Sequence, residues 1–199
     1  MEPARIYICR RRGAELDDVV ERLKRKDGAG LRILMNQYGD RLLRTAYLLL
    51  RDRQAAEEAV QDTFVQAFYK IEQLDDPAKL KAWLIRIAVN HCRMKQRTRS
   101  WRSILPSLHV ERMGEESASG AEEHFFEQWD KERLSEAMLR VEYKYREIMI
   151  LYYYNDLNVS EIAEQLSMKE NTVKSRLMRG RERLKMILRG RGIEDDLRA

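Results

Sequence analysis

The sequence predicts an all-α protein with two small helical domains joined by a flexible linker. Apolar residues recur at spacings of three and four along most of the chain, and no alternating run typical of a strand is present. Charged residues make up 36% of the 199 positions, whereas there are only 3 prolines and 9 glycines. This composition favours helices with solvated surfaces.

The first predicted domain spans residues 16–98, after an N-terminal extension over residues 1–15. Two or three helices are expected up to residue 67, and Pro77 beside two aspartates indicates a loop. The third helix has an apolar face formed by Val60, Phe64, Phe68 and Ile71. A further helix is expected from near Lys79 to beyond Asn90, with Trp83, Ile87 and His91 along one side.

Residues 99–130 are predicted to form an acidic linker. They contain seven acidic residues, several serines and no long apolar period. Helical periodicity resumes in residues 131–192, the second predicted domain, which is followed by a tail over 193–199. Three aromatic residues near the end of the linker are expected to pack onto this domain: Phe125, Phe126 and Trp129.

The second domain is predicted to contain a helix-turn-helix. Ser160 is a candidate N-cap for a short helix over 161–166, and residues 167–169 have the length of a turn. The second helix has an apolar stripe formed by Val173, Leu177, Leu184 and Leu188. Its opposite face shows Lys174, Ser175, Arg176, Met178, Arg179 and Arg183.

This arrangement suits docking into the major groove of DNA, because cations neutralise phosphates while shorter side chains reach base edges. Residues 170–192 hold eight basic and two acidic residues. A solvated surface helix is the alternative interpretation. The coincidence of a short helix, a short turn and a basic helix favours DNA.

A second basic segment lies before the linker. Residues 81–102 carry seven Lys or Arg and no acid, together with tryptophans and an amide. Cations, flat rings and amides are the groups that hold a separated DNA strand. The candidates are Trp83, Arg86, Asn90, Arg93 and Lys95. Alternatively, Trp83 belongs to the core and Asn90 caps the helix or binds solvent.

An acidic group lies on the helix that precedes this segment: Glu57, Glu58, Gln61 and Asp62. Acids repel DNA, so this face is expected to point at protein or water.

Several classes of function find no support in the residues. The three histidines lack metal-ligand spacing, and neither a phosphate-binding glycine loop nor a nucleophile motif is present. No enzymatic activity, metal or cofactor is therefore expected. Cys9 and Cys92 match no disulfide framework and are expected to be thiols. The longest apolar stretch is too short to span a bilayer, so a cytoplasmic location is expected.

Three segments together carry a resemblance to a known family. They are AAEEAVQDTFVQAF (55–68), WLIRIAVNHCR (83–93) and NVSEIAEQLSMKENTVKSRLMRGRERLK (158–185). In this order and spacing the chain resembles bacterial RNA polymerase sigma factors of the extracytoplasmic-function class, over about residues 17–188.

The resemblance implies a non-enzymatic factor that binds core RNA polymerase, recognises promoter DNA and assists melting. It assigns Glu57, Glu58, Gln61 and Asp62 to polymerase binding, and Asn90 to a flipped-out base in a pocket walled by residues 72–80. It assigns Ser175, Met178 and Arg179 to bases of the distal promoter element, and Thr172, Lys174 and Arg176 to its phosphates. It also implies an anti-sigma factor, which in this class is often membrane-anchored.

The sequence departs from the family pattern at several positions. Ser167 and Asn171 stand where glycine is common, and Leu74 and Leu80 stand where aromatic residues are common. A stand-alone helix-turn-helix regulator is the alternative interpretation, although it leaves the acidic face and the acid-free basic helix unexplained.

Overall fold

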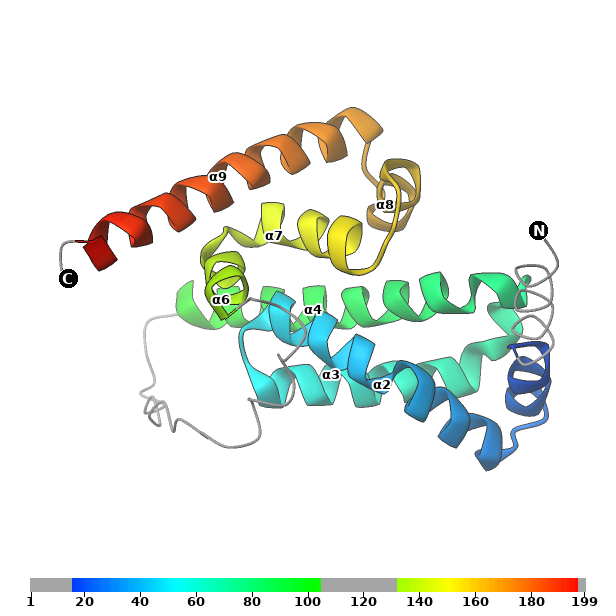
Figure 1. Cartoon of the computed structure of the whole chain (residues 1–199). Helices are drawn as coiled ribbons and strands as arrows, with labels where there is room; N and C mark the ends of the chain where they lie inside the picture. Colours follow the sequence, from blue (N-terminus) through cyan, green and yellow to red (C-terminus); the bar gives the residue numbers. More distant parts are fainter. Residues whose placement is uncertain (1–15, 105–131, 197–199) are drawn as a thin grey trace, which may run out of the picture. The chain divides into compact units, whose positions relative to one another are not determined.

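The computed structural model describes residues 16–104 and 132–196, and within these ranges all regular structure is helical, which confirms the predicted fold class (Figure 1). The chain divides into two compact units, Met1–Gln96 and Arg97–Ala199. The N-terminal extension with Cys9, most of the acidic linker with its aromatic residues, and the last three residues lie outside the described residues.

In the first unit, aspartate side chains cap the starts of three helices. A helix over 16–24 is followed by α2 (Gly28–Leu50), α3 (Arg53–Lys70), the short 3-10 helices η1 (Ile71–Gln73) and η2 (Pro77–Lys79), and α4 (Leu80–Ile104). The side chains of Asp27, Asp52 and Asp76 accept hydrogen bonds of 2.8–2.9 Å from backbone N–H groups at the starts of α2, α3 and η2.

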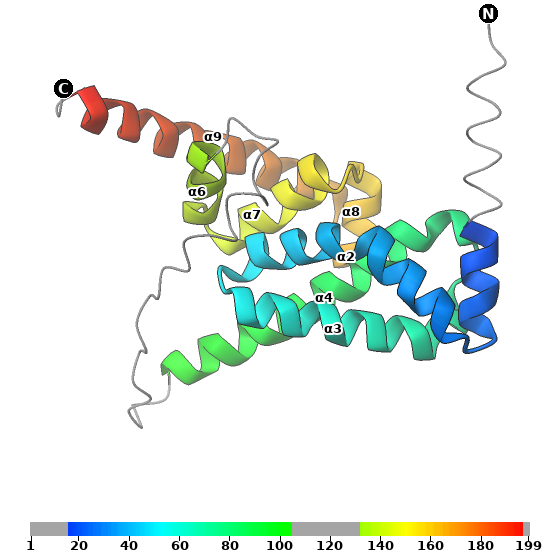
Figure 2. The same ribbon diagram turned by 60° about the horizontal axis from the view of Figure 1, so that its bottom comes forward.

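Helices α2, α3 and α4 enclose the core of this unit (Figures 1 and 2). Small residues of α3 are fully buried at Ala56, Ala59 and Ala67, which lets the neighbouring helices approach closely. The larger buried side chains include Leu34, Leu42 and Leu49 of α2, Phe64 of α3, and Leu84, Ile85 and Cys92 of α4.

Helix α4 is longer than the sequence suggested. The acidic linker is expected to begin at residue 99, whereas the helix continues to Ile104. The residues between contain no Pro or Gly, and the first helix breaker in the sequence is Pro106. The change in composition therefore precedes the end of the helix.

The second unit places one long helix against several short ones. Its elements are α6 (Glu132–Arg140), α7 (Tyr143–Met149), the π-helical turn η3 (Ile150–Tyr154), α8 (Val159–Leu166) and α9 (Glu170–Asp196). Helix α9 packs against α6, α7 and α8 (Figure 1).

A buried arginine joins α6 to α7 within this unit. Arg146 is 3% exposed, and its Nη1 donates hydrogen bonds to the carbonyls of Val141 (2.7 Å) and Leu139 (3.0 Å). These carbonyls lie at the end of α6, where a helix leaves its last acceptors unpaired and favours a positive charge. The guanidinium group of Arg146, which lies on α7, therefore caps the C-terminal end of α6.

Helix α8 is the first helix of the predicted helix-turn-helix, and its N-cap differs from the predicted residue. Asn158, not Ser160, is the N-cap, because the Asn158 side chain accepts from the Glu161 N–H (3.0 Å) and the Glu161 carboxylate accepts from the Asn158 N–H (2.7 Å). The helix ends at Leu166, and its C-cap is Ser167, which has the left-handed conformation with φ 53°. Glycine is common at this position in the family because it adopts the left-handed conformation without strain.

Helix α9 approaches α7 closely at Gly180. A Cβ atom at this position would lie 2.5 Å from Met149 Sδ and 3.0 Å from Met149 Cγ. Met149 is 1% exposed, so its side chain has little room to move away. A side chain at residue 180 would therefore require the buried Met149 side chain to shift.

We predict that Gly180→Ala destabilises the protein despite improving helix propensity. The clash costs about 1–3 kcal/mol, whereas glycine to alanine inside a helix gains at most about 1 kcal/mol, so a net loss of about 1 kcal/mol is expected. Urea unfolding followed by circular dichroism measures it. Gly39→Ala is the control, since nothing lies within 4 Å of its Cβ, and should gain about 0.5–1 kcal/mol. Equal stabilisation by both variants would contradict the packing role.

Candidate nucleic-acid and protein interfaces

Helix α9 has a buried and an outward face at its N-terminal half. Val173, Leu177 and Gly180 are buried, at spacings of four and three. On the opposite side Met178 is 54% exposed and Arg179 is exposed, while Ser175 is half-buried. The three residues assigned to bases from the sequence therefore lie on the side of α9 that faces away from its own domain.

The buried stripe differs from the predicted one beyond Leu177. Leu188 is 37% exposed and Leu184 is half-buried, so neither is a core residue. Gly180 occupies the inward position between them and Leu177, and apolar periodicity could not reveal it because glycine has no side chain. The buried stripe of α9 ends at Gly180, because no side chain from residue 181 to residue 189 is buried.

The residues assigned to phosphates are already engaged locally. Lys174 Nζ lies 3.7 Å from a Glu170 carboxylate oxygen, and both side chains are about half-exposed. Arg176 is half-buried, and its Nη1 lies 3.5 Å from Met168 Sδ in the turn. Thr172 is half-buried. These contacts are exposed or weak, so a phosphate group can replace them.

The candidates for single-strand binding on α4 differ in exposure. Asn90 and Arg86 are exposed and make no hydrogen bond to another described residue. Trp83 and Arg93 are half-buried, which places part of each side chain in the packing of the unit. An amide and a guanidinium group without local partners can bind a base edge and a phosphate without breaking an existing bond.

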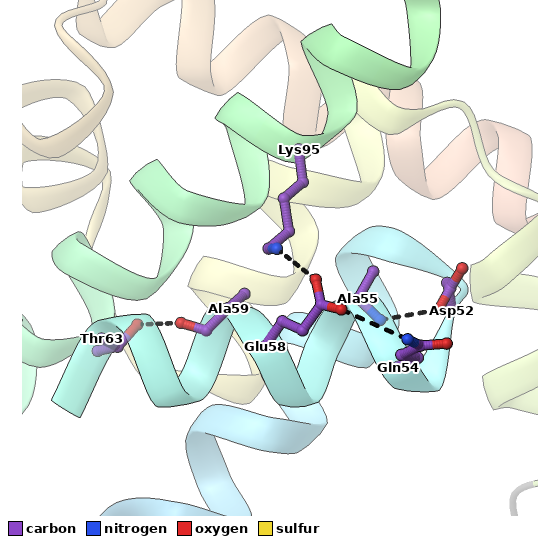
Figure 3. Close-up of polar contacts among 7 residues, drawn as sticks. All are labelled: Asp52, Gln54, Ala55, Glu58, Ala59, Thr63 and Lys95. Atoms are coloured by element: carbon purple, nitrogen blue, oxygen red, sulfur yellow. Dashed lines mark hydrogen bonds and ion pairs between the residues drawn. The ribbon is translucent and has the colours of Figure 1, made fainter. Parts of the chain in front are cut away.

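Lys95, another candidate for single-strand binding, forms an ion pair with Glu58 that could not be predicted from the sequence. Its Nζ donates to the Glu58 carboxylate at 2.8 Å, and this contact joins α4 to α3 (Figure 3). The same carboxylate lies 3.5 Å from the Gln54 amide, and the hydrogen bond and charge of Lys95 lower the pKa of Glu58. A residue assigned to DNA and a residue assigned to polymerase are thus paired with each other.

Residues 72–80 were expected to wall the base pocket, and the two leucines of this stretch are buried. Leu74 is 5% exposed and Leu80 is fully buried, so both side chains belong to the core. Apart from Ala78, the exposed side chains of this stretch are polar: Glu72, Gln73, Asp75, Asp76 and Lys79. The two leucines hold the loop in place, and the groups available to a base are mostly polar.

The acidic face of α3 is exposed as its sequence suggested. Glu57, Glu58, Gln61 and Asp62 are all exposed, and Glu57 accepts a hydrogen bond from Arg53 at 3.0 Å. The same face continues with two apolar side chains, because Val65 is 56% and Tyr69 is 71% exposed. Their spacing of three and seven from Asp62 could have predicted this extension.

His91 of α4 contacts α3, the helix that carries the acidic face. Its Nε2 lies 2.9 Å from Gln66 Oε1, and the neutral ring can donate this hydrogen bond. Burial lowers the pKa of His91, the nearby Asp62 raises it and Lys95 lowers it. The net direction is downward, so the folded protein favours the neutral ring.

Among residues 16–104 and 132–196, no group of His, Cys, Asp or Glu side chains is arranged to hold a metal ion. The helices within the same two ranges include none with the length and apolarity needed to cross a membrane.

Family comparisons match both units. The family described as Sigma-70 region 2 matches residues 34–102, and the family described as Sigma-70, region 4 matches residues 131–184. The first range contains the acidic face and α4, and the second contains the helix-turn-helix.

Curated relatives match along most of their length. The ECF RNA polymerase sigma factor SigW of Bacillus subtilis is 28% identical over 182 residues, which cover 85% of this chain and 95% of that protein. SigL of Mycobacterium tuberculosis is 27% identical over 168 residues, covering 84% of this chain and 93% of that protein.

Two solved structures share the fold. The sigma factor RpoE in complex with the anti-sigma factor NepR, from Bartonella quintana, has a TM-score of 0.59 at 23% identity and covers 79% of this chain and 96% of its own. CnrH, in complex with the cytosolic domain of CnrY, has a TM-score of 0.60 at 21% identity, with 86% and 96% covered.

We predict that His91 makes stability depend on pH below its ordinary pKa of 6.5. The unfolded chain takes up this proton at a higher pH than the folded chain, so the contribution of His91 is complete above pH 6.5 and is lost as pH falls through its lower folded pKa. Urea unfolding between about pH 8 and pH 5 tests this. His91→Gln should remove part of the slope, and an unchanged slope would contradict the assignment.

Proposed function

The chain belongs to the sigma-70 family, in its extracytoplasmic-function class, and we propose that its three exposed surfaces divide the work of promoter recognition. A sigma factor of this class binds core RNA polymerase and directs initiation at specific promoters. The exposed face of α3 binds polymerase, α4 captures a separated strand, and the outward face of α9 reads duplex DNA.

The outward face of α9 is the observation that carries this proposal. A helix that docks in the major groove must show its polar side to DNA while its apolar side stays in its own domain. Burial of Val173, Leu177 and Gly180 leaves Ser175, Met178 and Arg179 outward. Arg179 supplies the donors that suit guanine, and Met178 supplies apolar contact area.

The strand-capture role rests on the unpaired groups of α4. Asn90 and Arg86 are exposed, whereas the Lys95 ammonium group must leave Glu58 before it can bind a phosphate. We assign strand binding first to Asn90 and Arg86, with Lys95, Arg93 and Trp83 in support.

The polymerase-binding role rests on the chemistry of α3. Glu57, Glu58, Gln61 and Asp62 form an exposed acidic face that DNA would repel. Val65 and Tyr69 add apolar area at one end of it. Protein interfaces combine an apolar centre with polar surroundings, so this face suits a protein partner that carries positive charge.

The domain assignment follows from these roles. We assign residues 16–98 to a region-two-like domain and residues 131–192 to a region-four-like domain, and the acidic linker between them begins only after α4 ends at Ile104. The protein acts in the cytoplasm, where an anti-sigma factor holds it inactive. Among the similar chains of known structure, RpoE is in complex with the anti-sigma factor NepR, and CnrH is in complex with the cytosolic domain of CnrY.

A stand-alone helix-turn-helix regulator explains less. It accounts for residues 131–184 but gives no role to residues 34–102, which match region 2. Run-off transcription with purified core polymerase on genomic fragments, followed by mapping of start sites, tests the proposed function directly. Transcripts that start at shared promoter elements only when the protein is present support it, and an unchanged transcript pattern would refute it.

We predict that Asp62→Arg weakens binding to core polymerase by about tenfold or more. The substitution reverses the charge at an exposed position of the acidic face while leaving the Glu58–Lys95 pair intact. Surface plasmon resonance with immobilised core measures the affinity. Asp40→Arg, an exposed aspartate on α2, is the matched control and should bind normally. Equal affinities for the two variants would place the polymerase site elsewhere.

We predict that Asn90→Ala removes base discrimination in the melted strand. Loss of a hydrogen bond to one flipped base is expected to reduce preference for that base by about tenfold. Abortive initiation on pre-melted templates that carry each of the four bases at this position provides the measurement. Asn36→Ala, an exposed asparagine on α2, is the control. If the Asn90 variant keeps the preference of the unmodified protein, another residue makes this contact.

A further inference from the structure

Asn171 lies on the same outward stripe of α9 as the residues proposed to read bases. Asn171, Ser175 and Met178 follow one another at spacings of four and three. The buried stripe of Val173, Leu177 and Gly180 has the same spacings. At 3.6 residues per turn the two stripes lie about 160° apart, so residue 171 faces away from the domain core as directly as residues 175 and 178 do.

The side chain of Asn171 is available, unlike those of its neighbours. It is exposed and makes no hydrogen bond to another described residue. By contrast, Ser175 Oγ donates to the Thr172 carbonyl at 3.0 Å, and Lys174 lies 3.7 Å from the Glu170 carboxylate. The carboxamide of Asn171 has a free donor and a free acceptor, so it can bind a ligand without breaking a contact within the protein.

A role in helix capping does not explain this asparagine. Helix α9 begins at Glu170, and the carbonyl of Lys169 accepts the N–H groups of Thr172 (2.8 Å) and Val173 (3.2 Å). Residue 169 is therefore the N-cap, and Asn171 lies inside the first turn. Asparagine is a modest helix former, so propensity does not favour it there.

The position of Asn171 in the helix suits a base contact. Residues near the N-terminus of a recognition helix reach deepest into the major groove. From residue 171 to residue 178 the helix rises about 10.5 Å, close to the length of three base pairs at about 3.4 Å each. The stripe can therefore follow successive base pairs, with Asn171 at one end.

We propose that Asn171 is a specificity-determining residue that reads an adenine in the distal promoter element. A carboxamide can accept from adenine N6 and donate to adenine N7 together, a pairing that no other base offers in the major groove. This inference rests on the proposed function, because the groove is presented to α9 only in the holoenzyme. Asn171 would make a base contact that glycine, the common residue at this position in the family, cannot make.

Selection of DNA from a library tests the proposal. Holoenzyme assembled from core polymerase and the full chain selects promoters whose distal element is randomised, and sequencing gives the preference at each position. The unmodified protein should prefer adenine at one position, and Asn171→Ala should reduce that preference about fivefold to 150-fold while leaving the other positions unchanged. Asn171→Gln should retain it in part, since glutamine makes the same pair.

The controls separate this inference from the proposed function. Asn36→Ala should select as the unmodified protein does, and circular dichroism should show that all variants are folded. If the unmodified holoenzyme selects no distal element, the proposed function and the inference both fail. If it selects one and Asn171→Ala keeps the same preference, or weakens all sequences equally as a phosphate contact would, only the inference is overturned.

Discussion

Burial of Val173, Leu177 and Gly180 against the rest of the second unit fixes which face of α9 points outward, and the proposed DNA surface depends on that orientation. The backbone of α9 lies so close to α7 that a Cβ atom would meet Met149 Sδ at 2.5 Å. With Val173 and Leu177 buried on the same side, the helix cannot rotate without exposing apolar area. The opposite stripe is therefore held outward before DNA is present, which reduces the ordering that binding must impose.

The pair between Lys95 and Glu58 places two proposed binding surfaces in contact. One carboxylate of the acidic face on α3 accepts a 2.8 Å hydrogen bond from a lysine of the basic helix α4. A partner that binds α3 competes with Lys95 for Glu58, and a phosphate that binds Lys95 competes for the other side of the pair. Because exposed ion pairs contribute little to stability, either exchange is accessible in a complex.

Much of the fold could be predicted from residue type and spacing, but several details could not. Periodicity predicted the helices, and the short turn at Ser167 predicted the helix-turn-helix. Asn158 and Ser160 are both good caps by residue type, and only the reciprocal bond with Glu161 decides between them. The inward position of Gly180 could not be predicted, because a pattern of apolar side chains gives no information on a residue that has none. The Lys95–Glu58 pair joins residues 37 apart in sequence, so local reasoning could not find it.

In the proposed function, the protein recognises a promoter as part of the polymerase holoenzyme, and its two domains each contribute part of the specificity. Binding of a fluorescent promoter fragment to the purified chain, measured with and without core polymerase at fixed salt, tests this most directly. Binding is expected to be weak and nearly independent of sequence for the chain alone, and tight and promoter-specific with core. Tight and specific binding by the chain alone, as a dimer on a two-fold symmetric site, would contradict it.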